Sequence, residues 1–86
     1  MLFTSFGIIH GMIYSEDRTM LSVDFGYGDD YLVLTTKNKE LIDKMESFDL
    51  DGMFIAYGDP YALKIDGEWI RHIKLINIDR VVEERP

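Results

Sequence analysis

The side chains best suited to catalysis or metal binding are few and scattered along this sequence. Only two histidines occur, His10 and His72, and there is no cysteine. The ligand set of a structural zinc site is therefore incomplete, and a thiol nucleophile is excluded. The aspartates at 24–30 lack the alternating spacing and the closing glutamate of a calcium loop. With no serine or threonine in a recognisable nucleophile setting, we expect no enzyme, cofactor or metal.

Residues suited to aromatic stacking and to binding a charged ligand are instead grouped around the only tryptophan, Trp69. Asp66-Gly67 is the strongest hairpin signal in the chain. A two-residue loop there pairs Lys64 with Trp69 and places Arg71 on the same face. A tryptophan between two cations suits base stacking with phosphate contact on each side. The opposite face of this hairpin is predicted to be the buried one, with Tyr61, Leu63, Ile65 and Ile70.

Two other interpretations of this tryptophan remain open from the sequence. The indole of Trp69 could cap a barrel with Lys64 and Arg71 lying over its ring, or it could anchor a protein interface. If the patch binds nucleic acid, Tyr31 and Lys37 on the adjoining sheet surface are expected to extend it. Each further tyrosine is either part of this platform or half-buried in the barrel wall: Tyr14, Tyr57 and Tyr61.

The charge distribution favours a second class of function. Sixteen acidic residues oppose nine basic ones, which gives a net charge of −7 and a pI near 4.6. The acids are concentrated in residues 1–60, whereas residues 61–82 are locally basic. A non-specific nucleic-acid-binding surface is normally a basic stripe. The alternative function is therefore an acidic interaction module that binds a basic protein, for example a decoy that occupies a nucleic-acid enzyme.

The elements that must position these residues are mostly strands. Period-two alternation predicts strands over 6–14, 20–27, 31–36, 53–57, 61–65, 68–73 and 74–82. In the first, His10 shares a face with Ile8 and Met12, inside the barrel or at its rim. The strand at 53–57 is closed by 58–60. The apolar phase slips between Leu75 and Ile76, which predicts a bulge or bend there.

The turn after Tyr27 decides which face of the third strand is buried. A loop with an even number of residues pairs Tyr27 with Leu32 and directs Leu32 and Leu34 into the core. Tyr31, Val33 and Thr35 then face outward. We prefer this register because it keeps Asp24 away from apolar partners.

One segment, 38–48, has the pattern of a helix. Its apolar stripe consists of Leu41, Ile42, Met45 and Phe48. Asn38 is the expected N-cap, and Glu40 and Lys44 form a pair in the favourable order. The chain is thus predicted to be one mostly β domain, 1–86, forming a small five-stranded barrel of the OB type. The short helix lies between strands three and four.

Three features resemble single-stranded DNA-binding proteins of the OB type, mainly within residues 50–82. They are the glycine-flanked strand LDGMFIAYG at 50–58, the hairpin at Asp66-Gly67 and the apolar final strand at 72–82. The resemblance implies a non-catalytic protein that binds single-stranded nucleic acid, DNA rather than RNA. The sequence is shorter and more acidic than the bacterial members, and lacks their glycine-rich linker and acidic-aromatic tail. A phage or mobile-element protein is therefore expected.

The compartment and assembly are predicted from what the sequence lacks. No stretch reaches the ~18 apolar residues that span a membrane. The apolar N-terminus has no basic region or cleavage site, so we expect a first strand and a cytoplasmic protein. Self-association through the methionine-containing first strand or the barrel edge is a further alternative for its partners.

Overall fold

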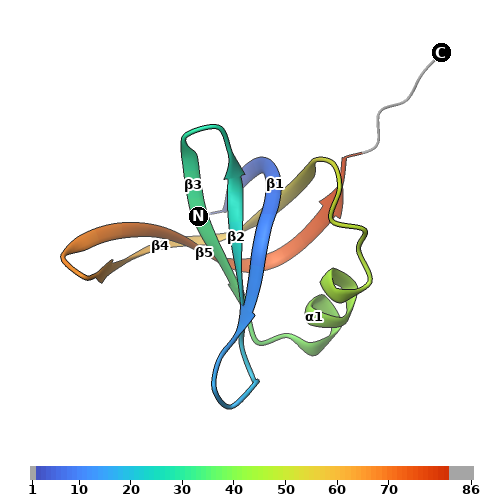
Figure 1. The fold of residues 1–86 in the computed structure, drawn as a ribbon, viewed down its shortest axis with the longest axis horizontal. Helices are drawn as coiled ribbons and strands as arrows, with labels where there is room; N and C mark the ends of the chain where they lie inside the picture. Colours follow the sequence, from blue (N-terminus) through green and yellow to red (C-terminus); the bar gives the residue numbers. More distant parts are fainter. Residues whose placement is uncertain (1, 82–86) are drawn as a thin grey trace.

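The strands of the computed structural model, which describes residues 2–81, close into a barrel (Figure 1). Around the barrel the order is β1-β2-β3-β5-β4, with β3 and β5 parallel and every other pair antiparallel. The predicted fold class, mostly β with a short helix between the third and fourth strands, is confirmed. The elements are β1 (Phe3–Tyr14), β2 (Leu21–Tyr27), β3 (Asp30–Thr36), α1 (Lys39–Glu46), β4 (Phe54–Ile65) and β5 (Glu68–Arg80).

The hairpin of β2 and β3 has the predicted faces but a tighter turn. Tyr27 pairs with Asp30, not with Leu32, so the loop contains two residues. Both registers leave Leu32 beside the core-facing side of β2, because the side-chain period of a strand is two. Gly28 adopts a φ of 63°, which glycine reaches without strain. The fully buried large side chains of the core are Leu21, Val23, Phe25, Leu34, Met45, Phe54, Ile73 and Ile78.

A bulge interrupts β1 between Ile9 and Gly11. Because of the extra residue, Ile9 is buried and Met12 also packs against the core. The predicted uninterrupted alternation, with Met12 and Ile9 on opposite faces, is therefore wrong. His10 lies at the bulge, exposed, with its Nε2 3.3 Å from the carbonyl oxygen of Gly26. It is not an interior residue.

The loop between β1 and β2 is ordered by one carboxylate. Asp17 accepts hydrogen bonds from the Ser15 hydroxyl at 2.7 Å, the Thr19 hydroxyl at 2.8 Å and the Thr19 amide at 3.1 Å. These donors, the Ser15 hydroxyl foremost, lower the pKa of Asp17 to about 2. A lowered pKa means that the carboxylate stabilises the folded loop above its ordinary pKa. That contribution is lost as the pH falls towards 2.

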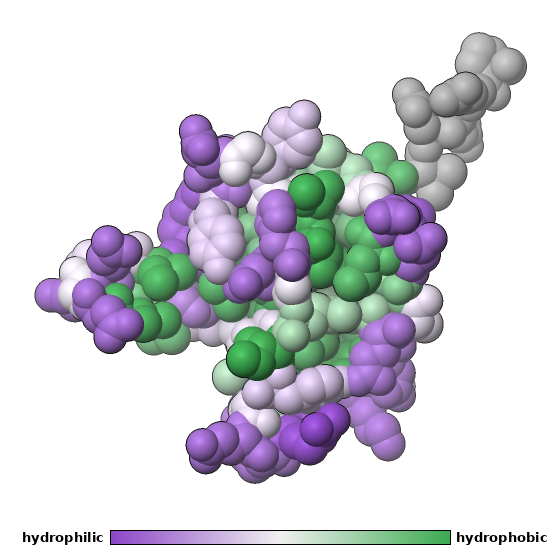
Figure 2. All heavy atoms as spheres, in the orientation of Figure 1, coloured by the Kyte–Doolittle hydropathy of each residue, from purple (hydrophilic) through white to green (hydrophobic). Residues whose placement is uncertain are grey.

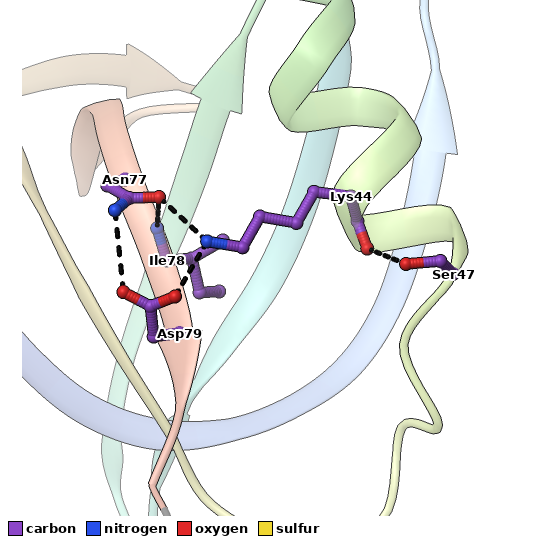
Figure 3. Close-up of polar contacts among 5 residues, drawn as sticks. All are labelled: Lys44, Ser47, Asn77, Ile78 and Asp79. Carbon is purple, nitrogen blue, oxygen red and sulfur yellow. Dashed lines mark hydrogen bonds and ion pairs between the residues drawn. The ribbon is translucent and has the colours of Figure 1, made fainter.

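The helix forms as its sequence predicts and is fixed to the barrel by a contact that the sequence does not predict. The side chain of Asn38 accepts hydrogen bonds from the amides of residues 40 and 41, and Leu41, Ile42 and Met45 are buried. Lys44 reaches across to β5, where its Nζ lies 2.6 Å from Asp79 Oδ1 and 3.1 Å from Asn77 Oδ1 (Figure 3). The predicted pairing of Lys44 with Glu40 is therefore replaced by one that joins α1 to the barrel.

The hairpin of β4 and β5 crosses the barrel and leaves it. β4 continues through residues 58–60, so the predicted break there is wrong. Gly58 permits this path because a Cβ atom would overlap the carbonyl oxygen of Lys74. The predicted bulge is confirmed: Gly58 pairs with Leu75 while the preceding Tyr57 pairs with Asn77. Beyond this crossing, residues 60–71 pair only with each other and with the start of the β3-paired segment, and they project from the barrel as a two-stranded ribbon, which we call the arm (Figure 1).

Within residues 2–81, no helix is long and apolar enough to cross a membrane. The same residues contain no group of three histidine or carboxylate side chains placed to hold a metal ion. The end of the predicted final strand, at residue 82, and residues 83–86 lie outside the described residues.

Candidate nucleic-acid interface

The arm has the register that the sequence predicts. Lys64 pairs with Trp69 and Ala62 with Arg71, around the two-residue loop of Asp66-Gly67. Trp69 is 70% exposed, the largest exposed fraction of any large hydrophobic residue within residues 2–81. The Nζ of Lys64 lies 6.0 Å from the centroid of its ring. At this distance the ammonium polarises the ring only weakly, so most of the indole face remains available.

The opposite face of the arm is not buried, contrary to the prediction. Tyr61, Leu63 and Ile65 are 38%, 46% and 43% exposed, and only Ile70 is half-buried. The prediction assumed a hairpin lying on the core, whereas the arm projects beyond the barrel and no second layer covers it. Figure 2 shows the resulting mixture of apolar and polar atoms on the arm, at the left of the molecule.

Strand alternation decides which surface of the barrel each face of the arm continues. Trp69 and Arg71 are in phase with Ile73, which is 1% exposed in the core. Their face therefore continues the inner side of the barrel wall. Tyr61 and its cross-strand partner His72 continue the outer side. The prediction that Trp69 is exposed is confirmed. The prediction that its face is the outer one is wrong, because that face continues the core side of β5.

Arg71 is placed at the root of the arm, beside the turn that joins β2 to β3. Its Nη2 lies 3.6 Å from Asp30 Oδ1, and the two side chains are 60% and 91% exposed. An exposed ion pair of this length contributes at most about 1 kcal/mol. The guanidinium is therefore available to exchange this carboxylate for another anion.

Tyr31 lies on the outer sheet surface, 47% exposed. Its hydroxyl donates a hydrogen bond to Asp24 Oδ1 at 2.7 Å, and this bond raises the pKa of the Tyr31 phenol. Thr35 is on the same face of β3 but is only 6% exposed. The prediction that it faces solvent is wrong because Tyr61 covers it, with 2.7 Å between the two hydroxyl oxygens.

Lys37 is separated from the tryptophan. It lines a groove of about 520 Å³ together with Lys74, Tyr61 and Met20. The groove lies between the root of the arm and the end of the β1–β2 loop, where Figure 2 shows the surface hollowed. Of the five predicted residues, Lys64, Trp69 and Arg71 share the inner face of the arm. Tyr31 and Lys37 lie on the outer surface near opposite ends of β3 and are not brought together.

Two residues of this groove are missing from the predicted site. Lys74 pairs with Thr35 in the parallel ladder between β3 and β5, which brings it towards Lys37. No local sequence signal predicts that parallel pairing. Tyr61 is stacked on the buried His72, with ring centroids 5.1 Å apart, and His72 Nδ1 lies 2.9 Å from the Ile70 carbonyl oxygen. His72 therefore fixes the tyrosine at the edge of the groove.

Comparison with known proteins identifies the fold. No family model matches this sequence, and no curated protein matches it. A small single-stranded DNA binding protein from Mycoplasma pneumoniae superposes with a TM-score of 0.67 and 16% identity, covering 99% of this chain and 97% of that one. A small single-stranded DNA-binding protein from Streptomyces coelicolor superposes with a TM-score of 0.69 and 7% identity, covering 95% of this chain and 93% of that one. The chain therefore has the fold of small single-stranded DNA-binding proteins along nearly its whole length.

Proposed function

We propose that this protein binds single-stranded DNA and performs no catalysis. The proposed contacts are Lys64, Trp69 and Arg71 on the arm with Tyr31 and Lys37 on the outer surface. The observation that carries the proposal is the exposed Trp69 beside Lys64, on an arm that projects freely from the barrel. The choice of DNA over RNA is supported by the two structural neighbours, both described as single-stranded DNA-binding.

The arm supplies the two interactions that a single strand needs. Stacking of one base on an aromatic side chain is worth about 1–3 kcal/mol and tolerates any base, because every base has a π face. Lys64 lies directly opposite Trp69 on β4, and Arg71 lies two residues along β5 on the same face. They can contact the phosphates that flank a base stacked on the indole.

The acidic composition is compatible with this function because the acids are unevenly placed. Five of the sixteen lie in residues 40–51, on and just after α1. On the arm, Asp66 and Glu68 equal Lys64 and Arg71 in number. Figure 1 places α1 on the side of the barrel away from the arm. Lys37 and Lys74 line the groove at the root of the arm. Local potential, more than net charge, steers a charged ligand to its site.

Titration of the intrinsic Trp69 fluorescence with oligothymidylate tests the proposal. Stacking should quench the emission at micromolar strand. With three phosphate contacts, the logarithm of the binding constant should fall with the logarithm of the salt concentration with a slope of about −2. Unchanged emission and an unchanged elution volume with the strand would contradict the proposal. If a basic polypeptide bound instead, the acidic interaction module would be favoured.

A further inference from the structure

The root of the arm contains a pocket that only one of the contacts proposed above, Arg71, lines. Its volume is about 330 Å³. Leu32 and Ile73, both buried, lie at its base, and Phe3 and Ala62 are among the residues around its opening. Arg71 also lines it, so a guanidinium lies beside a mainly apolar hollow.

The pocket is a consequence of how the arm leaves the barrel. The parallel ladder joins β3 to β5 at only three positions, Val33–Thr35 with His72–Lys74. Before these positions β5 belongs to the projecting arm while β3 turns back towards β2, so residues 30–32 have no ladder partner on that side. Phe3 of β1 borders the resulting gap but is still 37% exposed, so the space is left open.

The chemistry of the pocket fits a flat ring with apolar faces that is attached to an anion. Apolar walls with a single positioned charge are typical of small-ligand sites. The charge is Arg71, whose carboxylate partner Asp30 is 3.6 Å away and 91% exposed, so an incoming anion can replace it. Planar guanidinium groups bind phosphate through paired hydrogen bonds.

The position of the pocket favours one such ligand. Trp69 and Arg71 are two residues apart on one strand, hence about 7 Å apart on the same face. We propose that the pocket takes one unstacked nucleobase of the strand that stacks on Trp69, with the adjoining phosphate at Arg71. This inference rests on the proposed function and deepens it: one base is held by shape in a pocket while its neighbour is held by stacking.

The test fills the pocket by substitution and then measures at which strand position a base no longer contributes to the affinity. Ala62 is exposed and pairs with Arg71, so an Ala62→Phe side chain can occupy the hollow without displacing the core. Leu63→Phe adds an aromatic ring to the opposite face of the arm and is the matched control. Ala62→Leu fills less of the hollow and should give an intermediate effect even if the larger variant folds poorly.

The readout is the affinity for the shortest oligothymidylate that retains full binding, with a single abasic residue stepped along it. In the unmodified protein and in Leu63→Phe, two positions should be sensitive, each with at least about a fivefold loss of affinity. Ala62→Phe should abolish the sensitivity of one position, and Trp69→Ala that of the other.

The outcomes separate the pocket from the function on which it rests. Strand binding that quenches Trp69, with one sensitive position and no effect of Ala62→Phe, would overturn the pocket alone. Absence of binding to any strand would overturn the proposed function and the pocket with it. A further outcome is that Ala62→Phe alters the sedimentation of the free protein and leaves strand affinity unchanged. That result would assign the pocket to self-association of the protein, and the inference would be wrong.

Discussion

Replacing Trp69 with alanine should separate binding from folding. The ring is 70% exposed, so less than a third of its surface, roughly 50–75 Å², is removed from water in the folded protein. At about 25 cal/mol per Å², the substitution costs folding about 1–2 kcal/mol. A domain with a typical free energy of unfolding of about 5–15 kcal/mol remains folded after this loss.

The same substitution should weaken strand binding measurably while the protein stays folded. Loss of one stacked base removes about 1–3 kcal/mol, which weakens the affinity for oligothymidylate by about 5- to 150-fold. Fluorescence anisotropy of a dye-labelled strand measures this loss, because the variant has no tryptophan, and circular dichroism follows thermal unfolding. Trp69→Phe keeps a ring and should recover most of the affinity. Affinity of Trp69→Ala within twofold of that of the original protein, or loss of its cooperative unfolding, would contradict an exposed stacking role for Trp69.

Three further predictions concern charge, packing and pH. Arg71→Ala should reduce the salt dependence of strand binding by about 0.7 in the log–log slope; an unchanged slope would show that Arg71 meets no phosphate. Gly58→Ala should destabilise the fold by roughly 3 kcal/mol in chemical denaturation, because its Cβ would overlap β5, whereas Gly11→Ala, with open space around it, should not; equal effects would refute the crossing. The Asp17 carboxyl should titrate near pH 2 by NMR, and nearer its ordinary value in Thr19→Val; a midpoint at the ordinary value in the unmodified protein would contradict the loop hydrogen bonds.

The local parts of the fold were predictable because their signals are local. A two-residue turn at Asp66-Gly67 fixes every cross-strand pair of the arm. It does not by itself decide the exposure of Trp69, which is exposed because the arm leaves the barrel. The phase slip after Leu75 marked a real bulge for the same reason, since a bulge shifts side-chain alternation within one strand. The stripe and N-cap of α1 are likewise contained in about ten consecutive residues.

The remaining features depend on contacts between distant segments. The arm begins where β4 ceases to pair with β1, at Gly58. No motif in residues 58–60 predicts that this pairing ends there while the strand continues. Leu63 and Ile65 therefore have the composition of a buried face but lie in solvent. Thr35 is covered by Tyr61, 26 residues away in the sequence, and Lys74 reaches the groove through the parallel ladder. For this reason the sequence alone could not predict that Lys37 lies with Lys74 and away from Trp69.

Backbone amide chemical-shift mapping during titration with oligothymidylate tests the central claim most directly, because it reports where on the barrel a strand binds. The account predicts that the largest shifts fall on the arm, around Lys64, Trp69 and Arg71, and extend to Tyr31 and Lys37. Helix α1 and residues 47–51 should remain unchanged. Saturating strand that shifts no arm amide, or shifts confined to the acidic segment 40–51, would contradict it.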